Sequence, residues 1–306
     1  MRTFIGVIAA ALLAAPLAAS AALSVFACEP EWAALAKELG DQDVNTFSAS
    51  TAVQDIHKIQ ARPSLIAKYR QADLVVCTGA ELEIGWLPAL VTSSRNAKVQ
   101  PGGTGFLDAS GNVKILEIPT GQITRAMGDV HPQGNPHYWL DPGNGRLIAR
   151  TIRDKLIALS PTDRAGFEQR YAQFDTRLVA AEKKWDAALA PYKGAKLVTY
   201  HRSWPNFMER WGLNVIGYVE PKPGIPAPPT HIIQLIDEMQ RQNVKVIVVE
   251  PYFSLKTPQS IASRIGGTVL VLAPSVGGVK EAADYIGLFD YNVSQLAAAL
   301  KLSTGR

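Results

Sequence analysis

Histidine is rare in this chain, and one of its five copies lies in a segment that suits a fixed ligand. His137 belongs to the sequence GNPHYWLDP at residues 134–142. Pro136 keeps the residue before it out of the α region, so the backbone approaching the histidine is extended and stiff. Asp141 and Pro142 form a typical helix start, because the carboxylate accepts from first-turn amides and proline has no N–H to leave unpaired. The segment predicts a histidine held in a stiff loop before a helix; a hydrogen-bonded surface histidine is the alternative.

Two further histidines and one glutamate follow predicted strands. His57 lies in the loop after DVNTF, His201 directly follows KLVTY, and Glu250 directly follows KVIVV. In open parallel sheets, ligands bind in the crevice outside the carboxyl ends of the strands. His57 and His137 belong to the first half of the chain, and the other two residues to the second half. We therefore expect all four side chains to converge in a cleft between two lobes.

Three imidazoles and one carboxylate form a ligand set that suits a divalent transition metal. Zinc is bound by such nitrogen and oxygen atoms at about 2.0–2.2 Å. Magnesium and calcium prefer more oxygen ligands. Taken singly, each histidine is more often a packing or surface residue than a ligand. The metal hypothesis therefore depends on the shared position of the residues and not on any spacing between them.

Two neighbouring residues carry related chemistry. His131 lies six residues before His137 on a glycine-bearing loop. It could capture an incoming ion, but we expect it to be exposed to solvent. Asp55, two residues before His57, is a candidate to accept the second N–H of that imidazole and fix its tautomer; an exposed loop carboxylate is the alternative.

Strand and helix patterns alternate along the chain, which predicts an α/β fold with parallel, doubly wound sheets. In the first half, strands at 23–27, 43–47 and 73–77 alternate with helices near 30–39 and 62–71 and one starting near Ala80, and a looser stretch follows over 100–136. In the second half we expect strands KLVTY, LNVIGYV, KVIVV and TVLVL. The helices are expected near 203–211, from a cap at Thr230, near 256–265 and at the end of the chain.

A long helix is predicted between the two halves. Pro161 suits the first helical position, and apolar residues then recur every three or four positions to about Ala190. Nearly thirty residues at 1.5 Å each give a rod of roughly 43 Å, which we interpret as a rigid link between two lobes; a long surface helix of a single domain is the alternative. The predicted organisation is a signal peptide at 1–21, an N-terminal lobe at 22–159, the linking helix at 160–190 and a C-terminal lobe at 191–306.

The first 21 residues predict export. One basic residue, an apolar run from Phe4 to about Ala15 and small residues before a cleavage site are typical of a cleavable signal peptide. About 285 residues then remain for the mature protein, which we expect in the periplasm. Its net charge of +4 is spread without basic blocks, which argues against nucleic acid as a partner.

The two cysteines are expected to form a disulfide. Cys28 follows the first predicted strand and Cys77 ends the third, so their side chains would lie together if these strands are neighbours. An exported protein meets an oxidising compartment. Two buried free thiols are the alternative.

Four segments resemble the metal-binding family of periplasmic solute-binding proteins that deliver zinc or manganese to ABC transporters. They are GNPHYWLDP, ADLVVCTGAELEIGWLP, QDIHKIQARPS and YHRSWPNFMERWGL, and the likeness extends over about residues 23–300. The resemblance implies two (β/α) lobes joined by one long rigid helix, with the ion bound between them.

The resemblance also implies a ligand set. Its first histidine falls on His57, its second on His137 and its third on His201, where histidine points to the zinc-binding branch and manganese is the second choice. The aspartate that often gives the fourth ligand is missing, because Ala273 occupies its segment. We therefore predict Glu250 as the fourth ligand, with bound water as the alternative.

The predicted function is capture of Zn²⁺ as cargo and its delivery to an ABC transporter permease in the inner membrane, by a monomer that is not an enzyme. A periplasmic metallochaperone is a further partner that the sequence leaves open. Two other functions are the alternatives. A secreted zinc-dependent hydrolase is disfavoured because the chain has no H-E-x-x-H motif. A binder of a chelated metal would take up the chelate in preference to the free ion.

Overall fold

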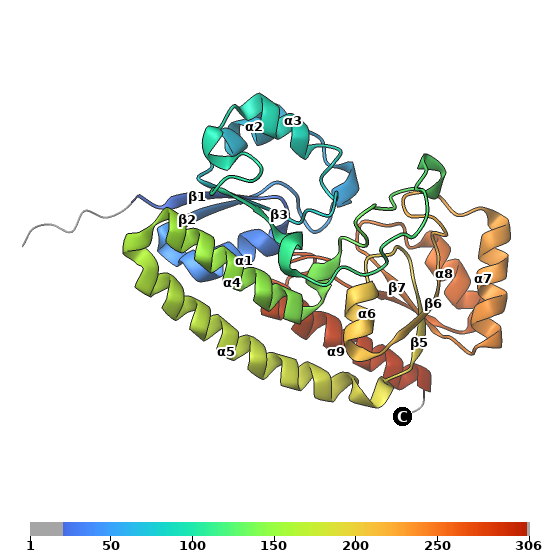
Figure 1. The fold of residues 1–306 in the computed structure, drawn as a ribbon. Helices are drawn as coiled ribbons and strands as arrows, with labels where there is room; N and C mark the ends of the chain where they lie inside the picture. Colours follow the sequence, from blue (N-terminus) through green and yellow to red (C-terminus); the bar gives the residue numbers. More distant parts are fainter. Residues whose placement is uncertain (1–20, 305–306) are drawn as a thin grey trace, which may run out of the picture.

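Two four-stranded parallel sheets form the framework of the protein in the computed structural model, which describes residues 21–304 (Figure 1). The strand orders are β2-β1-β3-β4 in the first sheet and β6-β5-β7-β8 in the second. The two sheets therefore have the same doubly wound order. The strands are β1 (Leu23–Ala27), β2 (Val44–Ser48), β3 (Leu74–Cys77), β4 (Phe106–Asp108), β5 (Lys196–Thr199), β6 (Asn214–Tyr218), β7 (Val246–Val249) and β8 (Thr268–Val271).

Helices follow the strands and cover the sheets, as the alternating pattern predicted. They are α1 (Pro30–Gly40), α2 (Pro63–Arg70), α3 (Leu87–Ser94), α4 (Pro142–Leu159), α5 (Arg164–Leu189), α6 (Pro205–Trp211), α7 (Pro229–Arg241), α8 (Lys256–Ile265) and α9 (Tyr285–Thr304). The predicted α/β class with two parallel-sheet lobes is confirmed.

The first sheet places its strand ends as the sequence predicted. β1 lies between β2 and β3, with Ala27 paired to Ser48 on one side and to Val76 on the other. The carboxyl ends of these strands are therefore adjacent. Cys28 and Cys77 are joined by the predicted disulfide, with their Cα atoms 4.8 Å apart.

The chain passes from the first sheet to the second through α4 and α5. The Asp141 carboxylate accepts from the Gly143 amide at 2.8 Å and caps α4, as predicted for the Asp-Pro pair. The 26 residues of α5 make a rod of about 39 Å at 1.5 Å rise per residue. Helix α5 packs against α1 and α4 of the first half and against α9 at the end of the chain (Figure 1). The predicted lobe boundaries around residues 160–190 stay a prediction.

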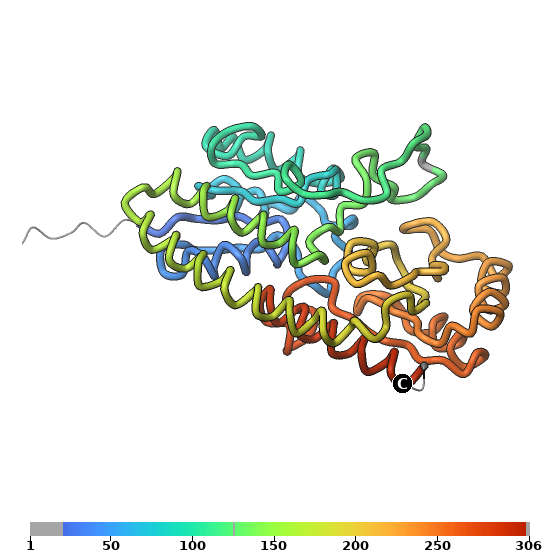
Figure 2. The backbone as a smooth tube through the Cα atoms, turned by 60° about the horizontal axis from the view of Figure 1, so that its bottom comes forward, coloured from blue at the N-terminus to red at the C-terminus, as the bar shows by residue number. Residues whose placement is uncertain are grey.

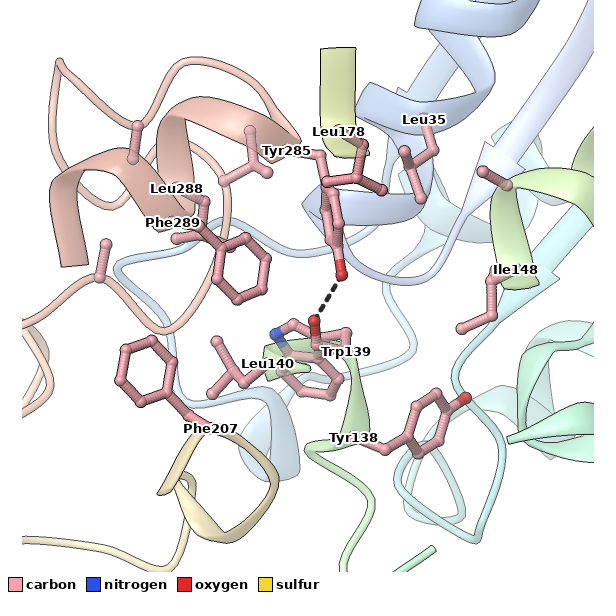
Figure 3. Close-up of a cluster of buried hydrophobic side chains, with 14 of the residues drawn as sticks. Leu35, Tyr138, Trp139, Leu140, Ile148, Leu178, Phe207, Tyr285, Leu288 and Phe289 are labelled. Carbon is pink, nitrogen blue, oxygen red and sulfur yellow. Dashed lines mark hydrogen bonds between the residues drawn. The ribbon is translucent and has the colours of Figure 1, made fainter. Parts of the chain in front are cut away.

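One hydrophobic cluster runs through both halves of the molecule. It extends from Val25 on β1 to Leu300 on α9 and includes Trp185 on α5. Figure 3 shows its middle, where the Tyr285 hydroxyl donates to the Trp139 carbonyl at 2.6 Å. Because this core is continuous, it fixes the two sheets relative to each other.

The segment after β4 crosses from the first lobe to the second (Figure 2). The Asp129 amide donates to the Pro223 carbonyl at 2.9 Å, and the Asn135 side chain donates to the Arg202 carbonyl at 2.7 Å. Residues 113–136, called the crossing loop below, therefore lie over the carboxyl ends of strands from both sheets.

Three local predictions were wrong. No helix starts at Ala80, because Gly79, Ala80 and Glu81 have φ values of 74°, 50° and 65° and form a left-handed turn before α3. The Glu83 carboxylate folds back on this turn and accepts from the Thr78 amide at 2.6 Å. The looser stretch contains β4, and α7 has no side-chain cap from Thr230.

The predicted signal peptide falls almost wholly on residues 1–20, which lie outside the described part of the chain. Within the described part, no helix combines the length and the apolar character needed to cross a membrane.

Candidate metal site

Three of the four predicted residues come together between the sheets. His57 lies in a 3₁₀ turn (Ile56–Lys58) after β2, His137 precedes a second 3₁₀ turn (Tyr138–Leu140), and His201 follows β5. One ring nitrogen of each lies within 4.8 Å of those of the other two. The three ring centroids are 5.5–5.6 Å apart.

The first two histidines are oriented by the residue two positions before them. The Asp55 carboxylate contacts His57 Nδ1 at 3.0 Å and also accepts from the His57 amide at 3.1 Å. The Asn135 side-chain oxygen contacts His137 Nδ1 at 3.1 Å and accepts from its amide at 3.0 Å. Each acceptor holds the proton on Nδ1 and leaves the lone pair of Nε2 for an ion. The predicted role of Asp55 as an orienting carboxylate agrees with this contact.

The third histidine is oriented by a residue that the sequence interpretation missed. Glu220 Oε2 lies 2.7 Å from His201 Nδ1, and both side chains are buried. Glu220 follows β6, the edge neighbour of β5, and its amide donates to the Tyr200 carbonyl at 3.0 Å. Glu220 directly follows the predicted strand LNVIGYV. Its position at the carboxyl end of a strand was therefore the signal that could have identified it.

Burial and charge act differently on two of these imidazoles. Burial lowers the pKa of His137 well below its usual value, and His57 and His201 lower it further by electrostatic repulsion. Burial also acts to lower the pKa of His201, but its hydrogen bond to Glu220 and the negative charge of Glu250 outweigh this and raise it. Glu220 and Glu250 therefore stabilise a positive charge on His201, on the side of the site that belongs to the second lobe.

Glu250 is completely buried beside this group but is not part of it. One carboxylate oxygen accepts from the Trp204 indole at 2.9 Å, while the other has no hydrogen bond to a described residue. Burial raises the pKa of this carboxyl group. Its oxygens do not join the set of ligand atoms within 4.8 Å of one another that the three histidines form. Its assignment as the fourth ligand stays a prediction.

His131 is not the exposed residue that its loop predicted. Its ring centroid lies 5.3 Å from that of His57, and its Nε2 atom is buried without a hydrogen-bond partner among the described residues. Burial lowers the pKa of this histidine to about 4. His131 is buried because the crossing loop packs onto the second lobe through Asp129 and Asn135, a contact that no local pattern encodes.

A small cavity opens beside the histidines. It has a volume of about 50 Å³ and is lined by His131, His137, His201, Asn135 and Arg202 together with other residues of the crossing loop. Sites for drug-sized molecules usually measure about 300–1,000 Å³. This cavity is therefore of a size that suits an ion with a few waters and lies well below that range.

Buried aromatic residues pack next to the three histidines. Tyr138, Trp139 and Trp204 are almost wholly buried next to the histidines, as expected for residues that exclude water. The Trp139 indole donates to the Pro274 carbonyl at 2.8 Å, which connects the His137 segment to the second lobe. The lobes are thus held together directly behind the ligand atoms.

The sequence matches one protein family over most of its length. Residues 25–299 match the family model described as ZnuA, zinc-uptake complex component A, periplasmic.

Individual relatives differ in the metal that their names give. The zinc-binding lipoprotein AdcA of Streptococcus pneumoniae serotype 4 is 22% identical over 267 residues, covering 85% of this chain and 52% of AdcA. This chain therefore spans about half the length of that relative. The manganese ABC transporter substrate-binding lipoprotein PsaA of Streptococcus pneumoniae is 22% identical over 274 residues, covering 87% of this chain and 85% of PsaA.

A solved structure has the same fold. The crystal structure of a zinc-bound ZnuA deletion mutant superposes with a TM-score of 0.77 at 25% identity, covering 91% of this chain and 98% of the other. The three-dimensional arrangement thus agrees with the match to the family model.

Proposed function

Because this chain belongs to the ZnuA family of periplasmic zinc-uptake components, we propose that it captures Zn²⁺ as cargo and delivers it to an ABC transporter permease. Members of the family are solute-binding proteins and not enzymes. The observation that supports the proposal most directly is the group of three histidines with ring nitrogens within 4.8 Å of one another.

The ligand chemistry favours zinc over manganese. Imidazole nitrogens suit zinc, whereas manganese is better served by carboxylate, carbonyl and water oxygens. Each of His57, His137 and His201 has its Nδ1 atom held by an acceptor, so three Nε2 lone pairs are preorganised. This arrangement lowers the cost of ordering the ligands when the ion binds.

The size of the cavity favours a free ion over a chelated ion as the cargo. A volume of about 50 Å³ has room for an ion and a few waters. We therefore propose the free ion, and not its chelate, as the cargo.

A competition titration tests the proposed function. Metal-free protein is titrated with zinc and with manganese against a calibrated chelator. We expect one equivalent of zinc to bind more tightly than manganese, and His137→Ala to weaken zinc binding by more than about 100-fold, beyond the usual effect of removing an outer-shell partner. Failure of the wild-type protein to bind one equivalent of zinc would contradict the proposal.

His231→Ala is the matched control. His231 lies at the start of α7 and contacts the Tyr218 carbonyl at 2.8 Å, away from the three-histidine group. Its removal should leave zinc affinity unchanged. Delivery is tested by zinc uptake into vesicles that carry the partner permease, with and without zinc-loaded protein.

A further inference from the structure

A second, larger hollow lies on the C-terminal lobe, between α7 and α8. The two helices pack against each other (Figure 1), and the groove between them has a volume of about 590 Å³. This volume lies within the range of about 300–1,000 Å³ that is usual for binding sites. The groove shares no described lining residue with the cavity beside the histidines. It is therefore a separate surface with room for several side chains of another chain.

The α7 side of the groove is apolar and stiff. Ile232 and Ile233 line it, and Ile233 is 54% exposed. Pro226 and Pro229, from the proline-rich segment 221–229, continue the lining. Proline fixes the backbone φ, so this wall is ordered before an occupant binds and little entropy is lost on binding. The exposed isoleucine favours an occupant that brings apolar side chains.

The α8 side of the groove is basic. Lys256 begins α8 and Arg264 lies near its end; both side chains are exposed, and neither forms an ion pair with a described residue. Eight positions separate them, which is about 12 Å along the helix axis. Four residues of an extended chain span about 13 Å. Two carboxylates four residues apart on an extended segment therefore match this pair of cations.

The groove also borders the ion site. Glu220 lines it and contacts His201 Nδ1 at 2.7 Å. Tyr200 lines it too, and its ring stacks on that of Phe253 at 4.2 Å, while the Phe253 ring lies 6.0 Å from that of His201. Glu220 is the one acidic residue in the described lining, and its buried carboxylate is held by His201. The charges that the groove presents to an occupant are therefore positive.

We propose that this groove binds an extended acidic segment of the permease that receives the ion. The inference rests on the proposed function and adds a docking surface to it. Charge complementarity with Lys256 and Arg264 favours carboxylates on the occupant, and the α7 side favours apolar residues between them. A position next to Glu220 and His201 suits a protein that takes the ion as it leaves the site.

Fluorescence anisotropy with a labelled peptide tests the chemistry of the groove. The probe is a short acetylated peptide that alternates leucine and glutamate, compared with the same peptide carrying lysine in place of glutamate. We expect the acidic peptide to bind zinc-loaded wild-type protein. The double variant Lys256→Glu/Arg264→Glu should bind it about 10-fold more weakly at low salt, and high salt should reduce this difference. Ile233→Ser should weaken binding by about 5-fold, because an apolar contact is lost.

Zinc uptake into vesicles that carry the partner permease tests the identity of the occupant. Lys256→Glu/Arg264→Glu should bind zinc as tightly as the wild type but deliver it about 5-fold more slowly or worse. Lys183→Glu/Lys184→Glu on the exposed side of α5 is the charge-matched control and should deliver zinc at the wild-type rate. Thermal unfolding checks that each variant is folded.

The outcomes separate this inference from the proposed function. If the wild-type protein binds no zinc, the proposed function fails and the docking surface falls with it. If the wild type binds and delivers zinc, and the Lys256/Arg264 variant delivers it equally fast, only the assignment of the groove to the permease is overturned, even where the acidic peptide binds. Tighter binding of the lysine peptide, or an equal loss of delivery in the α5 control, also overturns it.

Discussion

A buried carboxyl group at the lobe interface should make the stability of the metal-free protein fall as pH rises. Glu31 on α1 is fully buried and accepts a hydrogen bond from the Ser275 hydroxyl of the second lobe. Burial raises its pKa from 4.5 to about 8, with a smaller contribution from the negative charge of Glu83. Glu31 is therefore protonated in the folded protein at neutral pH and ionised in the unfolded chain.

The magnitude follows from linkage between proton binding and folding. Between pH 4.5 and about 8 the folded state holds more protons than the unfolded state, so the free energy of unfolding decreases with pH. A shift of about 3.5 pKa units at about 1.4 kcal/mol each gives an upper bound near 5 kcal/mol above pH 8. At pH 4.5 this contribution is absent.

Glu31→Gln removes the ionisation but keeps an oxygen that accepts from Ser275. We expect its stability to equal that of the wild type near pH 4.5 and to exceed it by several kcal/mol at pH 8. Glu29 and Glu83 are buried close by and their pKa values are also raised by burial, so part of the slope should persist in the variant.

Urea unfolding of metal-free protein at a series of pH values measures the effect. Glu168→Gln on the exposed side of α5 is the matched control and should not alter the slope. A difference between Glu31→Gln and the wild type that stays constant from pH 5 to pH 8 would refute the reasoning. So would a variant that is less stable than the wild type at pH 8.

Three further predictions concern the site and its framework. Glu220→Gln weakens the acceptor that orients His201, so zinc affinity measured by chelator competition should fall about 10–100-fold; an unchanged affinity argues against the orienting role. Replacing both Cys28 and Cys77 with alanine opens a loop of 49 residues and should cost about 4 kcal/mol by urea unfolding, and an unshifted midpoint would contradict this. Gly145→Ala places a methyl group 2.0 Å from a buried tyrosine hydroxyl and should cost about 1–3 kcal/mol, which a wild-type melting temperature would disprove.

The parts of the fold that follow local rules could be predicted from the sequence. Helix α8 has the predicted bounds, and the helix start at Asp141-Pro142 is capped as expected, because capping and apolar periodicity act over a few residues. The turn after β3 could not be predicted. Its left-handed residues depend on the Glu83 carboxylate, which satisfies backbone amides that a helix starting at Ala80 would have used differently.

The sequence alone was enough to predict that His57, His201 and Glu250 lie at the carboxyl edge of a parallel sheet, since each follows a strand. It could not determine which side chains meet. That depends on the continuous core, which sets one sheet against the other, and on partners distant in sequence, such as Glu220 for His201 and Trp204 for Glu250. The same long-range packing placed His131 next to His57, because a loop without local structure takes its position from the surfaces it packs against.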